Sequence, residues 1–118
     1  MTCNICGGSN IRLFKDDSNG RYYYKCMDCK ATKGCVDGTT KPYGIFANKN
    51  MRNLRRECHK LMDSFDNGNP RWKTQKHRRS LYRRLANAMQ LEEDTVHFAK
   101  LSEIQLEQAK MIMEAWKN

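Results

Sequence analysis

Two pairs of cysteines near the start of the chain are the residues best suited to chemistry. Cys3 with Cys6 and Cys26 with Cys29 each have the spacing C-x-x-C, and nineteen residues separate the pairs. Two such turns present four thiolates to one tetrahedral zinc ion. Four ligands leave no open position, so we expect one structural Zn²⁺ ion and no catalysis at the metal. Gly7 supports this site, because the residue after such a turn often needs an unusual backbone angle.

Other interpretations of the cysteines stay open at this point. The four could be unrelated cysteines of a reduced protein, or one pair could be a redox C-x-x-C motif, although no thioredoxin-like order of strand and helix surrounds either pair. Cys35 and Cys58 are left over, and we interpret each as a buried small side chain. Cys35 follows the second pair closely enough to compete for the metal.

The segment between the two pairs predicts a β-hairpin. Strand-like runs at residues 11–15 and 21–25 flank a stretch of turn-forming residues that ends in Asn-Gly. Apolar residues at steps of three and four then predict helices at about 48–65, 74–90 and 103–117. Ser102 and Gln105 form a capping box for the last helix, and its predicted packing residues include Ile104 and Met113.

These elements predict a small α+β fold, in which an N-terminal zinc-ribbon β-hairpin subdomain precedes a cluster of three to four helices. The predicted divisions are the zinc ribbon at 1–37, a linker at 38–47 that contains Pro and Gly, and the helical cluster at 48–118. A chain of 118 residues is too short for two large independent cores.

Charge is unevenly spread along the chain, whose formal net charge is +9. Residues 51–90 carry eleven Lys and Arg against three acids, whereas residues 91–118 carry three against six. A basic middle segment is typical of proteins that meet phosphates or an acidic partner, although many small domains are simply basic. No run of eighteen apolar residues occurs, so we expect no membrane association and a cytoplasmic location.

Two predicted helices carry the candidate contact residues for DNA or RNA. Arg and His side chains recur at steps of three and four on the first helix, so they share one face, and Arg residues crowd the second helix. The alternatives are a solvated face with intrahelical ion pairs, and a histidine that only packs. The candidates are Arg52, Arg55, Arg56, His59, Arg78, Arg79 and Arg83.

Tyrosines in the second predicted strand are further candidates for base stacking. A strand places Tyr22 and Tyr24 on one face and Tyr23 on the other, with lysines nearby in sequence for phosphates. Tyrosines in sheets also commonly pack against neighbouring elements, and this alternative stays open for at least one face.

The order of these features resembles a zinc-finger-containing domain family found in bacteriophage and prophage genomes. The resemblance spans about residues 3–112 and rests on the cysteine pairs, on Pro42-Tyr43-Gly44-Ile45-Phe46-Ala47, on Arg52, Arg55 and His59, and on Tyr82 and His97. It implies a zinc ribbon, a phage origin and a life inside a bacterial host cell, but no particular biochemical role. Arg84 stands where the family has a tryptophan, which predicts a more exposed second helix.

Two functions therefore stand as hypotheses. The first is a non-enzymatic, phage-derived protein that binds nucleic acid through its basic helices. The second is a phage-encoded inhibitor or adaptor that binds a host protein, such as a defence nuclease or RNA polymerase. We do not expect an enzyme, because the sequence has no carboxylate cluster, activated nucleophile or phosphate-binding glycine loop.

Overall fold

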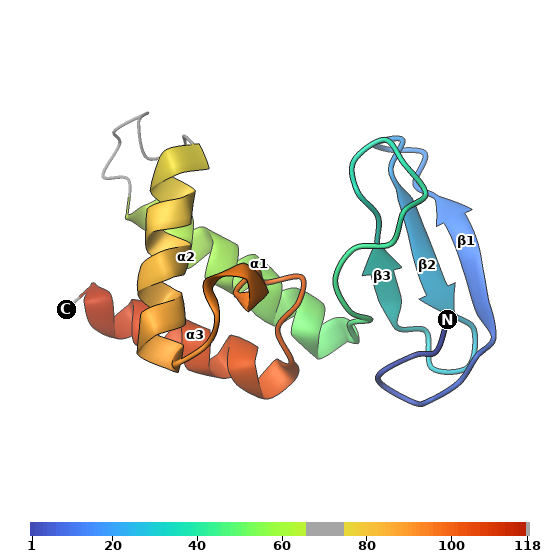
Figure 1. The fold of residues 1–118 in the computed structure, drawn as a ribbon. Helices are drawn as coiled ribbons and strands as arrows, with labels where there is room; N and C mark the ends of the chain where they lie inside the picture. The colour runs from blue at the N-terminus through green and yellow to red at the C-terminus, as the bar shows by residue number, and fades with distance from the viewer. Residues whose placement is uncertain (66–74, 118) are drawn as a thin grey trace. The chain divides into compact units, whose positions relative to one another are not determined.

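The computed structural model describes residues 1–65 and 75–117, with side chains from residue 79 onward in the second segment. The elements in chain order are strands β1 (Ile11–Lys15), β2 (Tyr22–Cys26) and β3 (Thr32–Gly34), then helices α1 (Lys49–Ser64), α2 (Gln75–Met89), a 3-10 turn η2 (Glu93–Thr95) and α3 (Glu103–Trp116). Figure 1 shows this order, which is the predicted small α+β fold. The chain divides into two compact units, 1–52 and 53–118.

The N-terminal unit is a three-stranded antiparallel sheet in the order β1-β2-β3. The predicted hairpin joins β1 and β2 through a turn that ends at Gly20, whose φ of +72° lies in the region that glycine adopts without strain. Strand β3 was not predicted, because three residues carry too little periodicity to be recognised. The core of this unit contains Cys3, Cys26, Ala31 and Phe46.

Residues 42–47, which fall in the predicted linker, run alongside β3. Ala47 pairs with Thr32, and Pro42 pairs with Cys35, both in antiparallel fashion. Phe46 is fully buried between these two points. The hydrogen bonds of this segment are therefore made to the ribbon itself, which extends the packed N-terminal unit beyond its third strand.

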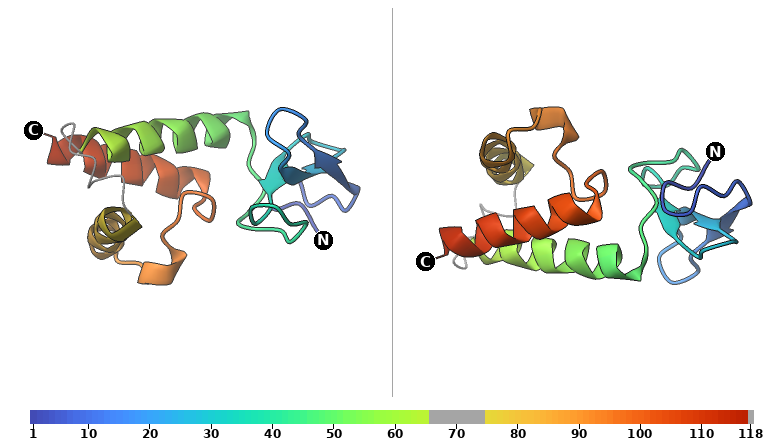
Figure 2. Two further views of the ribbon diagram at one scale, coloured as in Figure 1. Left: turned by 90° about the horizontal axis from the view of Figure 1, so that it is seen from above. Right: turned by 90° about the horizontal axis from the view of Figure 1, so that it is seen from below.

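The C-terminal unit is built from three helices. Figure 2 shows α1 and α3 running side by side while α2 crosses them. An ion pair of 3.0 Å between Glu57 and Lys110 joins α1 to α3. None of the helices in the described residues has the length and hydropathy needed to span a lipid bilayer. Among the residues of this unit whose side chains the structure describes, the buried ones are Leu54, Cys58, Met62, Leu81, Leu85, Ala86, Val96, Phe98, Leu101, Leu106, Ala109 and Met113.

The predicted capping box of α3 is confirmed. Ser102 accepts a hydrogen bond from the backbone N–H of Gln105, whose side chain accepts one from the backbone of Ser102. Leu101 and Leu106 are both buried around this cap, as expected of a hydrophobic staple. The prediction for Ile104 is wrong, because its side chain is 69% exposed rather than packed. Positions on a helix advance by about 100° per residue, which puts Ile104 on the side of α3 opposite to the buried Leu106, Ala109 and Met113.

Candidate metal centre

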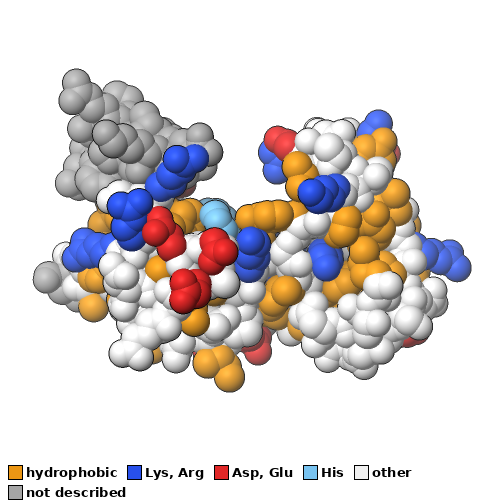
Figure 3. Space-filling view, viewed as in Figure 1, with side chains coloured by type: hydrophobic (Ala, Val, Ile, Leu, Met, Phe, Trp, Pro, Cys, Tyr) orange, Lys and Arg blue, Asp and Glu red, His pale blue; other side chains and the backbone are white. Residues whose placement is uncertain are grey.

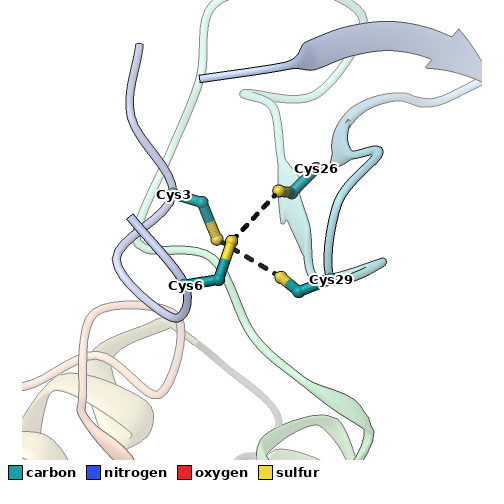
Figure 4. A group of neighbouring side chains, drawn as sticks. All are labelled: Cys3, Cys6, Cys26 and Cys29. Atoms are coloured by element: carbon teal, nitrogen blue, oxygen red, sulfur yellow. Dashed lines mark hydrogen bonds between the residues drawn. The ribbon is translucent and has the colours of Figure 1, made fainter. Parts of the chain in front are cut away.

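The four predicted ligands come together in the N-terminal unit. Cys3 and Cys6 lie in the segment before β1, Cys26 ends β2, and Cys29 lies in the turn that follows. Their four Sγ atoms all lie within 4.8 Å of one another. Figure 4 shows the four side chains converging on a common centre. The sulfurs of Cys3 and Cys29 lie 3.6 Å apart, as do those of Cys6 and Cys26.

These distances fit a zinc ion bound by four thiolates. A Zn–S bond of about 2.3 Å in tetrahedral geometry places neighbouring sulfurs about 3.8 Å apart. A disulfide would instead require about 2.0 Å, and all six cysteines are free. The donor set is one that zinc prefers, and it is complete without water. The cluster therefore fits one structural zinc ion, as the spacing predicted.

The two C-x-x-C turns share the same backbone hydrogen bonds. In the first, the Gly7 N–H donates to the carbonyl of Cys3 over 2.8 Å, and the Cys3 N–H donates to the carbonyl of Gly8 over 2.8 Å. The second turn repeats both bonds, from the Lys30 N–H to the carbonyl of Cys26 over 2.8 Å and from the Cys26 N–H to the carbonyl five residues later over 2.9 Å. These bonds close each turn and place its two thiols on the same side of the turn, where both can reach one metal ion.

The residue after each turn adopts a left-handed backbone. Gly7 has a φ of +78°, which confirms the predicted reason for a glycine there. Lys30 occupies the equivalent position with a φ of +70° and bears the strain that a side chain causes in this region. The second turn therefore reaches the same geometry as the first at a conformational cost.

The backbone favours ionisation of the Cys26 thiol, whereas desolvation and the neighbouring thiols oppose ionisation of Cys29. The backbone N–H of Cys29, with that of Asp28, lowers the pKa of Cys26 to about 7. The N–H of Ala31 also favours the Cys29 thiolate, but desolvation and the neighbouring thiols outweigh it and raise the pKa of Cys29 to about 12. Four thiolates this close need a cation between them, and a zinc ion would supply two positive charges.

Asn4, inside the first turn, joins the metal centre to the segment 42–47. Its side-chain oxygen accepts a hydrogen bond of 2.7 Å from the Phe46 N–H, and its amide group donates one of 3.0 Å to the Phe46 carbonyl. Phe46 packs in the core with Cys3 and Cys26. This contact could not be predicted from the sequence, because Asn4 is an ordinary polar residue and its partner lies 42 residues away.

The two remaining cysteines lie outside the cluster. Cys58 is fully buried on α1, as predicted, and its thiol donates to the carbonyl of Leu106 over 3.6 Å. Burial raises the pKa of Cys58 to about 11. Cys35 is half-buried beside Pro42, and desolvation raises its pKa. Among the described residues, the group of ligands suited to a metal consists of Cys3, Cys6, Cys26 and Cys29.

Comparison with known families agrees with this centre. The sequence model of a zinc-finger-containing domain matches residues 1–116. The chain belongs to this zinc-finger-containing domain family. The match covers both units, so the helices are part of the family's domain together with the zinc ribbon. Searches of curated proteins and of solved structures found no match.

Several predicted contact residues make internal contacts. The guanidinium of Arg52 donates to the carbonyl of Ala47 over 3.0 Å, and that of Arg55 donates to the carbonyl of Ala99 over 2.9 Å. Arg83 forms an exposed ion pair of 3.1 Å with Glu93. These three side chains therefore have structural partners that compete with any ligand.

The other predicted helix residues whose side chains the structure describes are exposed. Arg56 on α1 and Arg79 on α2 are exposed. His59 is exposed and lies edge-on to the ring of Phe98, 4.9 Å between centroids, as the packing alternative expects. Arg78 lies within α2, but its side chain is outside the described residues.

Tyr22 and Tyr24 lie on the side of β2 that faces the core of the N-terminal unit. Tyr24 packs against that core, and its hydroxyl donates to the carbonyl of Thr40 over 2.8 Å. The ammonium of Lys15 lies 5.8 Å from the centre of the Tyr22 ring. Tyr23 faces the opposite side, where it stacks on Phe14. The open aromatic face of the sheet is therefore that of Tyr23.

Proposed function

We propose that this protein is a non-enzymatic, structural-zinc protein of phage origin that binds nucleic acid in the cytoplasm of its bacterial host. The zinc ion would hold the ribbon folded, because a segment this short cannot bury enough apolar surface to order itself. Phosphate contacts would come from the basic helices. The phage origin rests on the resemblance of the motifs in residues 42–59 and 82–97.

Nucleic-acid binding is supported by three exposed Lys and Arg side chains that form no ion pair with an acidic residue of the described chain. Arg56 and Lys60 lie four residues apart on α1, so they share one face, and Arg79 lies on α2. All three are exposed, and within the described residues none forms an ion pair. Figure 3 shows basic and acidic side chains mixed on this unit, so the proposal rests on these three positions rather than on a uniform basic surface.

A salt titration of DNA and RNA binding tests the proposal. Each phosphate contact contributes about 0.7 to 0.9 to the slope of log affinity against log salt. We expect the substitutions Arg56→Ala, Lys60→Ala and Arg79→Ala together to reduce that slope by about two to three. Arg83→Ala is the matched control on α2, since Glu93 already neutralises this side chain. Absent binding, or affinity that does not change with salt, would rule out the proposal.

Absence of catalysis is tested separately. The proposed zinc site has no position for a substrate, so we expect no cleavage of nucleic acid when magnesium or zinc is added. Turnover that survives purification and is lost in a Cys26→Ser variant would overturn this part of the proposal.

A protein-binding inhibitor or adaptor acting on a host factor, such as a defence nuclease or RNA polymerase, is the second candidate function. It is favoured by Ile104 and Met111, which are 69% and 70% exposed seven residues apart on α3. Met111 borders a hollow of about 280 Å³ that Met89 and Gln108 also line. A stoichiometric host protein retained after nuclease treatment, and lost in an Ile104→Glu, Met111→Glu variant but not in Glu107→Gln, would favour this function over the first.

A further inference from the structure

One face of the β1-β2 hairpin lies opposite to the core residues Cys3, Cys26 and Phe46. The register pairs Ile11 with Cys26 and Leu13 with Tyr24, and these positions belong to the core side. Side chains alternate along a strand, so the residues between them lie on the opposite side. That opposite side consists of Arg12 and Phe14 on β1, Tyr23 and Lys25 on β2, and Thr32 and Gly34 on β3.

Two cations on this face lie directly opposite each other. Arg12 and Lys25 are cross-strand partners in the register of β1 and β2. Like charges at directly opposed positions destabilise a sheet. Neither Arg12 nor Lys25 forms an ion pair with any described residue. The carboxylate of Asp37, in the same unit, is paired with Arg21 at 3.0 Å instead. An anion between Arg12 and Lys25 would remove this repulsion.

The next set of cross-strand partners on this face consists of Phe14, Tyr23 and Gly34, which form one row across the three strands. The rings of Phe14 and Tyr23 lie 5.6 Å apart with an angle of 19° between their planes. The next residue in the same row is Gly34, which pairs with Tyr23. A Cβ atom built on Gly34 would have no atom within 4 Å, so nothing crowds the sheet surface at this position next to Tyr23.

We propose that this face binds single-stranded nucleic acid, with a base stacked on Tyr23 above Gly34 and its phosphate between Arg12 and Lys25. Adjacent rows of a sheet place an aromatic platform beside two cations, which matches the alternation of base and phosphate in one strand. A duplex does not offer this arrangement, because its bases are already stacked on one another. The choice of ligand class rests on the proposed function, but the surface is a different one.

The experiment compares a labelled single-stranded oligonucleotide with a duplex of the same sequence, by fluorescence anisotropy at fixed salt, using the zinc-loaded full chain. We expect the single strand to bind more tightly. Tyr23→Val keeps a strand-forming residue but removes the platform, and we expect roughly 10- to 100-fold weaker binding of the single strand. Tyr22→Val, on the same strand and the other face, is the matched control and should change the affinity less than threefold.

Two further variants separate binding from folding. Gly34→Val fills the open position without meeting any atom at its Cβ, so we expect a folded, zinc-loaded protein with an affinity loss similar to that of Tyr23→Val. Arg12→Glu converts the repulsive pair into an attractive one, so we expect a more stable ribbon that binds the single strand at least tenfold more weakly. If this face had only a structural role, Arg12→Glu would not both stabilise the ribbon and weaken its binding of the single strand.

The outcomes also separate this inference from the proposed function. If the sheet variants bind as the unaltered protein does, while the variants of Arg56, Lys60 and Arg79 lose affinity, the inference fails and the proposed function stands. If neither single strands nor duplexes bind, both fail. Equal affinity for single strand and duplex, unaffected by Tyr23→Val, would likewise overturn the inference.

Discussion

Replacing Gly7 by alanine isolates the contribution of one backbone angle to the metal centre. Gly7 has a φ of +78°, and a Cβ atom at this position would meet nothing within 4 Å. Crowding therefore adds nothing to the cost of Gly7→Ala. The folded ribbon is destabilised only by holding an alanine in a left-handed conformation, which costs about 1 to 2 kcal/mol. In a ribbon this small, folding and metal binding are coupled. We therefore expect the zinc affinity of Gly7→Ala to fall roughly 5- to 30-fold.

The assay is competition for zinc with a chromophoric chelator of known affinity at fixed pH. Gly34→Ala is the matched control, because its Cβ also meets nothing within 4 Å but its φ is not left-handed, and we expect less than a twofold change. Gly8→Ala tests crowding by the added Cβ atom instead of backbone conformation. Its backbone is ordinary, but its Cβ would lie 2.5 Å from the Asp28 carboxylate and 3.2 Å from the sulfur of Cys6, so both side chains would have to shift and we expect a lower zinc affinity caused by crowding.

Lys30 provides the reverse substitution at the equivalent position of the second turn. Its φ is +70°, so Lys30→Gly relieves strain in the folded protein, while the greater freedom of glycine in the unfolded chain offsets part of the gain. We expect unchanged or slightly higher zinc affinity. Equal affinities for Gly7→Ala and the unaltered protein, or a clear loss in Lys30→Gly, would refute the reasoning that these two angles shape the site.

Three further predictions concern single contacts. Asn4→Ala removes two hydrogen bonds to the backbone of Phe46 and should lower the free energy of unfolding by about 1 to 3 kcal/mol in urea, with zinc present. Ser102→Ala removes the cap of α3 and should cost about 1 kcal/mol, visible as a lower melting temperature, whereas substitution of the exposed Glu107 should not. The raised pKa of Cys58, about 11, means that the unfolded chain loses this proton first as pH rises. The contribution of Cys58 to the free energy of unfolding should therefore be constant below pH 9 and disappear between pH 9 and 11. The measurement is the difference in unfolding free energy between the unaltered protein and Cys58→Ala as a function of pH.

Local patterns were enough to predict the zinc ligands and most of the elements. The spacing of Cys3, Cys6, Cys26 and Cys29 identified the metal centre, because four thiols on two short turns have few other arrangements. The strands, helices and the cap at Ser102 were also recognisable, since hydrophobic period and capping residues act over a few positions. These parts of the fold are determined by neighbours in the sequence.

Contacts between distant residues could not be predicted in the same way. The bonds of Asn4 to Phe46 and of Arg55 to Ala99 join residues more than forty positions apart. Helical spacing correctly placed Arg52 and Arg55 near one another on α1, but it says nothing of whether a guanidinium meets solvent or a backbone carbonyl. For Arg55 the outcome depends on where the distant segment that contains Ala99 passes, which only the folded chain shows.

Whether a side chain is used in an internal contact decides whether it is a good candidate for ligand binding. The motif residues that gave the family resemblance, Arg52, Arg55, His59, Tyr82 and His97, all contact other parts of their own unit. Folding alone would retain such residues, so their presence in a motif does not indicate a binding site. A repulsive pair such as Arg12 and Lys25, beside the open position at Gly34, has no comparable value for folding. Positions that cost stability and gain no internal partner are therefore the better guide to what this protein binds.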